Sequence, residues 1–356
     1  MKKVTVDISK KYDIIIEYGA LNKAGEYIKN AVGGDVAVIV TDDVVDKLYS
    51  KALETSLINS GYQIKKFVFP NGEISKNTTT YIELLNFMAV NKITRSDVVC
   101  ALGGGVVGDL SGFAAATYLR GISYVQIPTT LLSAVDSSVG GKTAVDLDCG
   151  KNLVGAFYQP NLVLCDYSTL STLSEDIFRD GCAEIIKYGV IADKDLFNKL
   201  KNVMSLDMTK SQNDELEQII ERCVSIKRDV VTEDEKDNGL RQILNFGHTI
   251  GHAVENCSNY TISHGSAVAI GMIAIANICA NMNICKRECA DEIINIVKDY
   301  GFQSEITYSN EDLFNVITSD KKRKGASISL IVSTEIGTCE IKKVPIEEVL
   351  AMLSLM

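Results

Sequence analysis

Short apolar runs alternate with helical patterns through the first half of the chain. The runs are rich in β-branched residues and end at turn-forming or small polar residues, which is typical of strands buried in a parallel sheet. Strands are predicted at residues 13–19, 36–40, 62–69, 97–102, 124–127 and 162–165. Because helical patterns separate these strands, the first half is predicted to consist of parallel βα units.

Helical periodicity dominates from about Ser174 onward. Long helices are predicted at residues 175–191, 214–231, 241–257 and 265–280. One late β-hairpin is predicted at residues 327–332 and 338–343, around the turn at Gly337. The pattern therefore predicts an α/β domain at residues 1–173 and a mainly α-helical domain at residues 174–356.

Length, charge and cysteine content narrow the class of protein. A chain of 356 residues is long for one compact core and suits two domains. The net charge of −10 argues against nucleic acid and anionic membranes as partners, because both attract a basic surface. The longest apolar stretch, residues 267–280, is shorter than the roughly 20 residues of a membrane span. With no signal-peptide pattern and no CxxC spacing, the ten cysteines indicate free thiols in a cytoplasmic protein.

A glycine triplet, Gly103–Gly105, joins a predicted strand to a helix. Such a loop lets the backbone approach a diphosphate, and the helix N-terminus offers free N–H donors. A tight turn would explain the triplet equally well, because it is not the GxGxxG pattern. Asp109, expected in the first helical turn, and Thr129 and Thr130 at the end of the next strand favour a nucleotide site. The two threonines would alternatively cap the following helix.

A polar segment at residues 136–152 carries two lysines, Lys142 and Lys151, that each directly follow a glycine. Lysines in this setting are able to reach a phosphate. Alternatively, both are ordinary surface lysines on an exposed loop. The length of the segment favours function, because structureless loops of this size are uncommon in compact proteins unless they are functional.

All three histidines of the chain, His248, His252 and His264, fall within 17 residues. His248 and His252 are spaced i, i+4 and share a face of the predicted helix, so the residues alone would pair them as ligands. Neutral imidazoles suit Zn²⁺, and a catalytic zinc needs about three protein ligands and an open position. Any one of these histidines would more simply be structural, but the cluster favours a metal site.

Charged residues interrupt the apolar pattern of two predicted helices. Glu184 and Lys187 are spaced i, i+3, and either an internal ion pair or a functional site explains them. Arg241 lies four residues before Asn245, on the face expected to point toward the histidines. Lys227 alone would be a solvated surface lysine.

A series of segments, in this order and spacing, closely resembles the 3-dehydroquinate synthases, a family of sugar-phosphate cyclases. No single segment is decisive, but the ordered set covers nearly the whole chain. The segments are residues 71–76, 103–109, 115–121, 127–132, 136–143, 150–160, 181–189, 244–253 and 264–272.

The resemblance implies an α/β N-terminal nucleotide-binding domain, which binds NAD, and a mainly α-helical C-terminal metal- and substrate-binding domain. The implied metal ligands are Glu184, His248 and His264, so His252 moves from the metal to the substrate. The implied substrate pocket contains Arg120, Asp136, Lys142, Asn152, Lys187, Lys227, Arg241, Asn245 and His252, with either Lys321 or Lys322. The implied NAD-binding residues are Asp42, Asn71, Gly72, Glu73, Ile74, Ser75, Lys76, Gly105, Val106, Val107, Gly108, Asp109, Thr129, Thr130, Lys142, Lys151, Thr169, Leu170, Ser171 and Thr172.

The implied enzyme is a carbon–oxygen lyase of the shikimate pathway, which leads to chorismate and the aromatic amino acids. It converts 3-deoxy-D-arabino-heptulosonate 7-phosphate to 3-dehydroquinate by transient oxidation with NAD, phosphate β-elimination, re-reduction and aldol closure. A Zn²⁺ or Co²⁺ ion assists, and the expected assembly is a cytoplasmic homodimer. Two residues depart from the family pattern: Ala144 replaces a usual glycine, and Ser266 replaces a common glutamate beside His264.

Three other functions are compatible with parts of this pattern. A sibling cyclase would act on another sugar phosphate, but the set of Lys187, Lys227, Arg241, Asn245 and His252 favours a substrate with a carboxylate. A metal-dependent alcohol dehydrogenase would release NADH. An NAD-binding regulator would need no metal.

Overall fold

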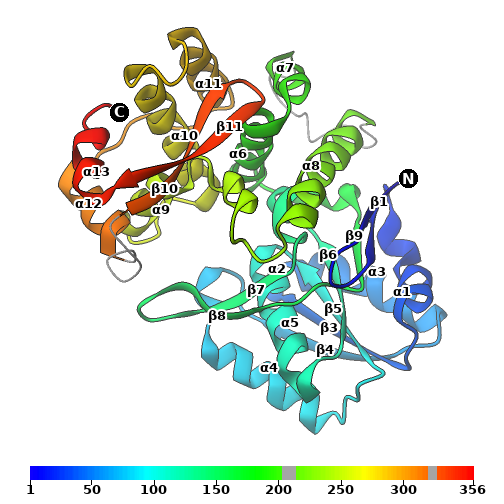
Figure 1. The fold of residues 1–356 in the computed structure, drawn as a ribbon. Helices are drawn as coiled ribbons and strands as arrows, with labels where there is room; N and C mark the ends of the chain where they lie inside the picture. The colour runs from blue at the N-terminus through cyan, green and yellow to red at the C-terminus, as the bar shows by residue number, and fades with distance from the viewer. Residues whose placement is uncertain (203–213, 320–326) are drawn as a thin grey trace. The chain divides into compact units, whose positions relative to one another are not determined.

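The computed structural model describes residues 1–202, 214–319 and 327–356, so Lys321 and Lys322 lie outside the described residues. The chain divides into two units (Figure 1). One comprises Met1–Ser174 and Met208–Lys236, and the other comprises Glu175–Asp207 and Asp237–Met356. The first division falls one residue from the expected boundary. Helix α8 (Asp214–Glu233) differs from expectation by belonging to the first unit, because it packs against strands β1 and β2.

The first unit is built on a seven-stranded sheet with the order β1-β2-β9-β6-β5-β3-β4. Only β1 and β2 are antiparallel, and every other neighbouring pair is parallel. The strands are β1 Lys2–Val6, β2 Tyr12–Ile16, β3 Val36–Asp42, β4 Gln63–Phe69, β5 Val98–Gly103, β6 Ser123–Pro128 and β9 Leu162–Cys165. All the predicted strands are confirmed, and β1 is an additional strand that the sequence pattern did not predict.

Helices cover both faces of this sheet (Figure 1). Helices α1 (Ala24–Val32) and α3 (Lys51–Asn59) pack on one face, where Ile39 of β3 points. Helices α4 (Thr78–Val90) and α5 (Gly105–Thr117) pack on the other face, where the neighbouring Val38 and Val40 point. Because both faces are covered, the central strands are continuous apolar runs, as expected for a doubly wound parallel sheet.

Residues 142–157 form a second, two-stranded sheet, which corrects the expectation of a structureless loop. Strands β7 (Lys142–Leu147) and β8 (Gly150–Phe157) pair in an antiparallel hairpin. Val145 is fully buried against α5, and a Cβ at Gly155 would lie 2.1 Å from the Thr143 carbonyl oxygen. The polar turn between the strands concealed their short β-branched pattern.

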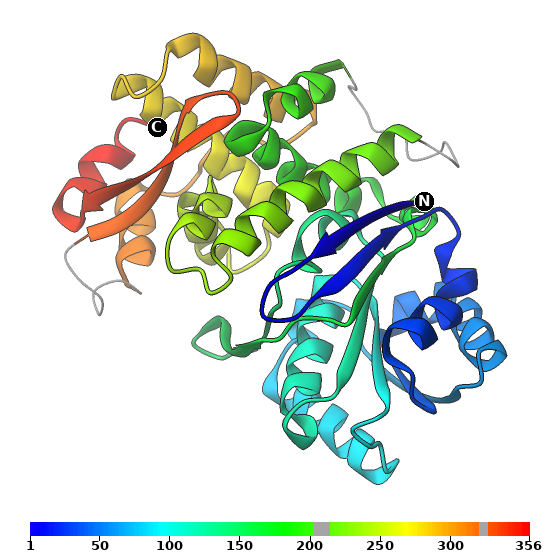
Figure 2. The same cartoon turned by 45° about the vertical axis from the view of Figure 1, so that its right-hand side comes forward.

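The second unit is mainly helical, with a β-hairpin beside the helices (Figure 2). Its helices are α6 Glu175–Ala192, α7 Lys194–Asn202, α9 His248–Cys257, α10 His264–Asn281, α11 Arg287–Asp299, α12 Asn310–Ser319 and α13 Ile346–Leu353. Its hairpin, β10 Ser327–Glu335 and β11 Thr338–Pro345, confirms the prediction.

Helix α10 is the central helix of the second unit. It contacts α6, α9, α11 and β10, and its apolar side chains point in all directions, as in a helix enclosed by protein. Among the described residues it is the one helix long and apolar enough to cross a membrane, and 72% of that stretch is buried within the structure. Burial on this scale is typical of the core helix of a soluble protein.

The single helix predicted at residues 241–257 is wrong. The segment forms a 3₁₀ helix, η7 (Leu240–Asn245), followed by α9, and Gly247 between them has a φ of 77°. A Cβ at Gly247 would lie 2.9 Å from the Val268 carbonyl oxygen of α10. Glycine is therefore needed both for the left-handed backbone and for the approach of α10. The break makes His248 the first residue of α9.

The contact between α9 and α10 predicts the effect of a single methyl group. A Cβ at Gly271 of α10 would lie 1.9 Å from the Gly247 carbonyl oxygen, so Gly271→Ala must push the two helices apart. We expect it to lower the free energy of unfolding by about 1–3 kcal/mol. Gly150→Ala is the matched control, because its Cβ would meet only the flexible Leu153 side chain at 3.1 Å. Chemical denaturation measures both, and equal stabilities would contradict this packing.

Candidate active site

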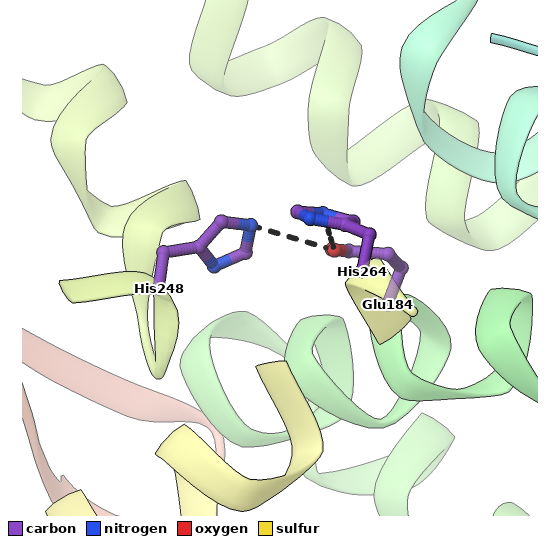
Figure 3. Close-up of side chains that lie close together, drawn as sticks. All are labelled: Glu184, His248 and His264. Carbon is purple, nitrogen blue, oxygen red and sulfur yellow. Dashed lines mark ion pairs between the residues drawn. The ribbon is translucent and has the colours of Figure 1, made fainter. Parts of the chain in front are cut away.

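Three side chains from three helices converge in the second unit (Figure 3). Glu184 comes from α6, whereas His248 and His264 are the first residues of α9 and α10. The Nε2 atoms of His248 and His264 each lie 3.4 Å from Oε1 of Glu184. Ligand atoms bound about 2.1 Å from a tetrahedral zinc lie about 3.4 Å from one another. The three residues therefore fit the ligand set of one divalent ion.

The other ring nitrogen of each histidine has an acceptor. Nδ1 of His248 lies 3.0 Å from the Phe246 carbonyl oxygen, and Nδ1 of His264 lies 3.5 Å from Oε2 of Glu255. In the tautomer that carries its proton on Nδ1 and donates it to these oxygens, the Nε2 lone pair is directed at Glu184. In that tautomer both imidazoles are oriented to bind a metal ion through Nε2.

Glu184 is a buried carboxylate held in its charged form. Its side chain is 1% exposed, and it forms a buried ion pair with Lys187 one turn later. Burial would raise the pKa of Glu184, but the charge of Lys187 and the interaction with His248 hold that pKa well below its usual value. The pair was predicted to be either an internal ion pair or part of a functional site. The two explanations are compatible, because Glu184 is ion-paired with Lys187 and also faces the histidines.

His252 lies one turn after His248 on the same helix. Its ring centroid is 5.3 Å from that of His248 and 5.9 Å from that of His264. Burial by the surrounding protein and the two neighbouring imidazoles lower the pKa of His252, which favours the neutral form of its ring. It therefore lies beside His248 and His264, and its neutral form is able both to donate and to accept a hydrogen bond.

Asp180 anchors the start of α10, where Ser266 replaces the glutamate that is common beside His264 in the family. Its Oδ1 accepts hydrogen bonds from the Ser263 hydroxyl at 2.6 Å and the Ser266 backbone N–H at 3.2 Å. A carboxylate at a helix N-terminus satisfies unpaired N–H groups and interacts favourably with the helix dipole. The carboxylate next to Ser266 therefore comes from α6.

The remaining substrate candidates of this unit lie on η7. That segment contacts α6, which carries Glu184 and Lys187, and Arg241 is 2% exposed. Arg241 and Asn245 do not share an α-helical face with the histidines, since Gly247 interrupts the helix.

The NAD candidates of the first unit follow strands of the sheet. Parallel strands end at the same edge, and in open α/β sheets ligands bind at the carboxyl edge. Asp42 is the last residue of β3. The segments that follow β4, β5, β6 and β9 at this edge contain residues 71–76, residues 105–109, Thr129 and Thr130, and residues 169–172.

Three hydroxyl and carboxyl groups at this edge have distinct roles. Thr130 Oγ1 accepts a hydrogen bond from the Ser133 backbone at 3.2 Å, so it caps the next turn. Asp42 caps α2 (Asp43–Val45) by accepting two backbone hydrogen bonds at 2.9 Å. Thr129 Oγ1 is buried without a hydrogen-bond partner in the described structure.

A buried lysine, Lys76, connects helix α5 to the β7–β8 hairpin. Nζ of Lys76 lies 2.6 Å from Oδ2 of Asp109 and 2.6 Å from Oδ1 of Asn152. Asp109 is in the second turn of α5, one turn later than predicted. Burial raises the pKa of Asp109 despite the opposing charge of Lys76. A predicted NAD residue and a predicted substrate residue are therefore in direct contact.

Lys227 and Asp136 also meet. Nζ of Lys227 on α8 lies 3.0 Å from Oδ1 of Asp136 and donates to its carbonyl oxygen at 2.7 Å. The surface interpretation of Lys227 is wrong, since this residue is 6% exposed. Lys142 is exposed at the start of β7, and Lys151 lies 3.8 Å from Glu73.

Arg120 does not lie with the other predicted site residues of the first unit. It follows the C-terminal end of α5 and precedes β6, at the edge of the sheet opposite the glycine loop.

Two residues of the candidate site, Asp180 and Glu255, were not predicted from the sequence. The only signal for Glu255 was its spacing of seven residues from His248, which places both on one face of a helix.

Comparisons with known proteins agree with this geometry. The family model described as 3-dehydroquinate synthase N-terminal matches residues 66–180, and the C-terminal model matches residues 181–323. A 3-dehydroquinate synthase of Clostridium botulinum is 46% identical over 98% of this chain and 99% of its own length. One of Clostridium acetobutylicum is 45% identical over 98% of each chain.

Among solved structures, 2-deoxy-scyllo-inosose synthase in complex with carbaglucose-6-phosphate, NAD⁺ and Co²⁺ superposes with a TM-score of 0.88. It is 26% identical and 99% of each chain is covered. The doubly wound sheet, the helical unit and the converging Glu–His–His set define a sugar-phosphate cyclase. The chain belongs to the 3-dehydroquinate synthase family. It is a lyase that eliminates phosphate and closes a ring, and its cofactors are NAD and a divalent metal ion.

The anchor at the start of α10 predicts the effect of losing one carboxylate. Asp180→Ala removes the acceptor of the Ser263 and Ser266 hydrogen bonds, and we expect stability to fall by about 0.5–2 kcal/mol, as for loss of a helix cap. Asp176→Ala is the control, because Asp176 is exposed on the same helix and pairs only peripherally with Arg179 at 2.8 Å. Thermal unfolding compares the two variants, and an Asp180→Ala protein as stable as the control would contradict this role.

Proposed function

We propose that this chain converts 3-deoxy-D-arabino-heptulosonate 7-phosphate to 3-dehydroquinate and phosphate with a metal ion held by Glu184, His248 and His264. The observation that carries this assignment is the approach of two imidazole Nε2 atoms to one carboxylate oxygen at 3.4 Å each. One anionic and two neutral ligands leave a coordination position for substrate. When bound, the ion supplies Lewis-acid stabilisation of a deprotonating alcohol, and NAD supplies a reversible hydride acceptor.

Cationic side chains of this chain are assigned to the two anionic groups of the substrate. Lys187 and Arg241 are buried in the second unit, and Lys227 is buried in the first. Buried cations of this kind suit a carboxylate and a phosphate, because charge-assisted hydrogen bonds are stronger than neutral ones. Three buried cations suit a substrate that carries both a carboxylate and a phosphate, whereas a simple alcohol would need none of them.

Neutral groups are assigned to orientation of the leaving phosphate. The lowered pKa of His252 keeps its imidazole uncharged, so it is able to donate one hydrogen bond and accept another. Asn152 is held by Lys76 through its side-chain oxygen, which leaves its amide group for the phosphate. The phosphate itself is a suitable acceptor for the proton released before elimination.

The NAD site is assigned to the carboxyl edge of the sheet in the first unit. Support comes from the glycine loop after β5, the unpartnered Thr129 hydroxyl, the end of β3 and the segments that follow β4 and β9. The N-terminus of α5, which begins at Gly105, offers backbone N–H groups to the diphosphate. Lys142 and Lys151 are the cations assigned to the same cofactor.

The remaining parts of the proposal concern the assembly and its location. We assign a cytoplasmic homodimer that binds neither nucleic acid nor membrane, in keeping with the net charge of −10 and the thiols left free in the described residues. Arg120 is assigned to the substrate by family resemblance alone.

Metal removal tests the function directly. Chelator-treated protein, Glu184→Gln and His264→Ala should each lose at least about 100-fold in kcat for phosphate release with catalytic NAD, because a Lewis acid contributes several kcal/mol to such a step. Zn²⁺ or Co²⁺ should restore the treated protein but not His264→Ala. Circular dichroism checks that both variants fold, and full activity of the metal-free protein would refute the proposal.

Lys142 provides a second test. Lys142→Ala should raise the KM for substrate or NAD about tenfold, the effect of losing roughly 1.4 kcal/mol of binding. Thermal stability should not change, since the side chain is exposed. Lys11→Ala is the control, because that exposed lysine of the same unit pairs only with Asp7 at 3.7 Å. Equal kinetic constants in wild type and Lys142→Ala would remove this lysine from the site.

A further inference from the structure

We infer that Glu255 is the positioning residue that fixes His264 as a metal ligand, by accepting a hydrogen bond from its Nδ1–H group. The inference rests on the proposed metal site and adds a residue to it. Glu255 is 5% exposed on α9, and its Oε2 lies 3.5 Å from Nδ1 of His264 at the start of α10.

A neutral imidazole carries one proton on either of its two nitrogens. It binds a metal through Nε2 only when the proton is on Nδ1, so an acceptor facing Nδ1 selects the competent tautomer and holds the ring. His248 has such an acceptor in the Phe246 carbonyl oxygen at 3.0 Å. Glu255 occupies the corresponding position for His264.

The need for a side-chain acceptor follows from the place of His264 in the fold. His248 follows Gly247, which has a left-handed backbone conformation. The resulting bend places the Phe246 carbonyl oxygen beside the imidazole of His248. His264 follows Ser263, whose extended backbone has a ψ of 158° and whose hydroxyl is bonded to Asp180. The acceptor for Nδ1 of His264 comes instead from α9, nine residues earlier in the chain.

The two acceptors differ in charge, which gives the inference a measurable consequence. A carboxylate makes the histidine a stronger metal ligand than a carbonyl does, and loss of such a partner typically weakens metal binding about 10–100-fold. Glu255 should therefore act on metal affinity even though it does not contact the metal.

A second metal ion is the main alternative for Glu255. Ligand atoms of His252, Glu255 and His264 lie within 4.8 Å of one another. Binding an ion there while Nε2 of His264 serves the first site would require His264 to lose both ring protons. A hydrogen bond from Nδ1 to the carboxylate avoids this cost, and the geometry favours it.

The test is a Co²⁺ titration of metal-free wild type, Glu255→Gln and Glu255→Leu, with affinity measured by chelator competition and the ligand field by visible absorption. Wild type should bind one equivalent. Glu255→Gln retains an acceptor but loses the charge, so its affinity should fall about tenfold; Glu255→Leu loses both, so its affinity should fall about 100-fold. The absorption bands of both variants should shift, because the His264 ring is no longer held.

Asp193→Asn is the matched control. Asp193 is a buried carboxylate of the same unit that caps α7 by accepting from the Leu196 backbone at 2.9 Å. It lies nine residues beyond Glu184, about 13 Å along the helix direction. Its variant should bind Co²⁺ like wild type.

Each other outcome overturns a distinct claim. Wild type that binds no cobalt would refute both the metal site and the role of Glu255. One tightly bound equivalent with unchanged affinity and spectrum in Glu255→Gln would refute the role of Glu255 alone, even if that variant unfolded at a lower temperature. Two equivalents in wild type, falling to one in the variants, would establish the second-ion alternative. If Glu255→Leu does not fold, Glu255→Gln decides.

Discussion

The backbone contact between α9 and α10 is the constraint on which the candidate active site depends. Each helix begins with a histidine, and a Cβ at Gly271 would lie 1.9 Å from the carbonyl oxygen of Gly247. Only glycines permit this approach. It brings His248 and His264 close enough for both to face Glu184, and it places Glu255 of one helix beside the imidazole of the other.

Burial of charge is the second feature of this site. Glu184 lies in an apolar helix, where an isolated carboxylate would be strongly unfavourable. Lys187 offsets part of that cost, and the Nε2 atoms of the two imidazoles face the same oxygen. Lone pairs and negative charge that converge in a buried place are stabilised by a cation. The buried carboxylate and the two imidazoles are therefore unfavourable without a cation, and the same groups favour binding of a divalent ion.

Periodicity predicted most of the fold, because strands buried on both faces and helices packed on one side leave clear patterns. The β7–β8 hairpin escaped prediction since its polar turn outweighs a short apolar alternation, and the break at Gly247 escaped since the pattern of residues 241–257 continues across it. The histidine cluster indicated a metal. Spacing alone would have paired His248 with His252, because it cannot show that His264 starts a helix in contact with α9. Family resemblance instead indicated Glu184, His248 and His264, the three residues that lie together in the structure.

The central claim is that Oε1 of Glu184 and the Nε2 atoms of His248 and His264 bind one divalent ion. Anomalous diffraction from crystals loaded with Co²⁺ tests it most directly. The account predicts a single strong peak within about 2.0–2.2 Å of these three atoms. A peak held by other residues, or none in this unit, would contradict it.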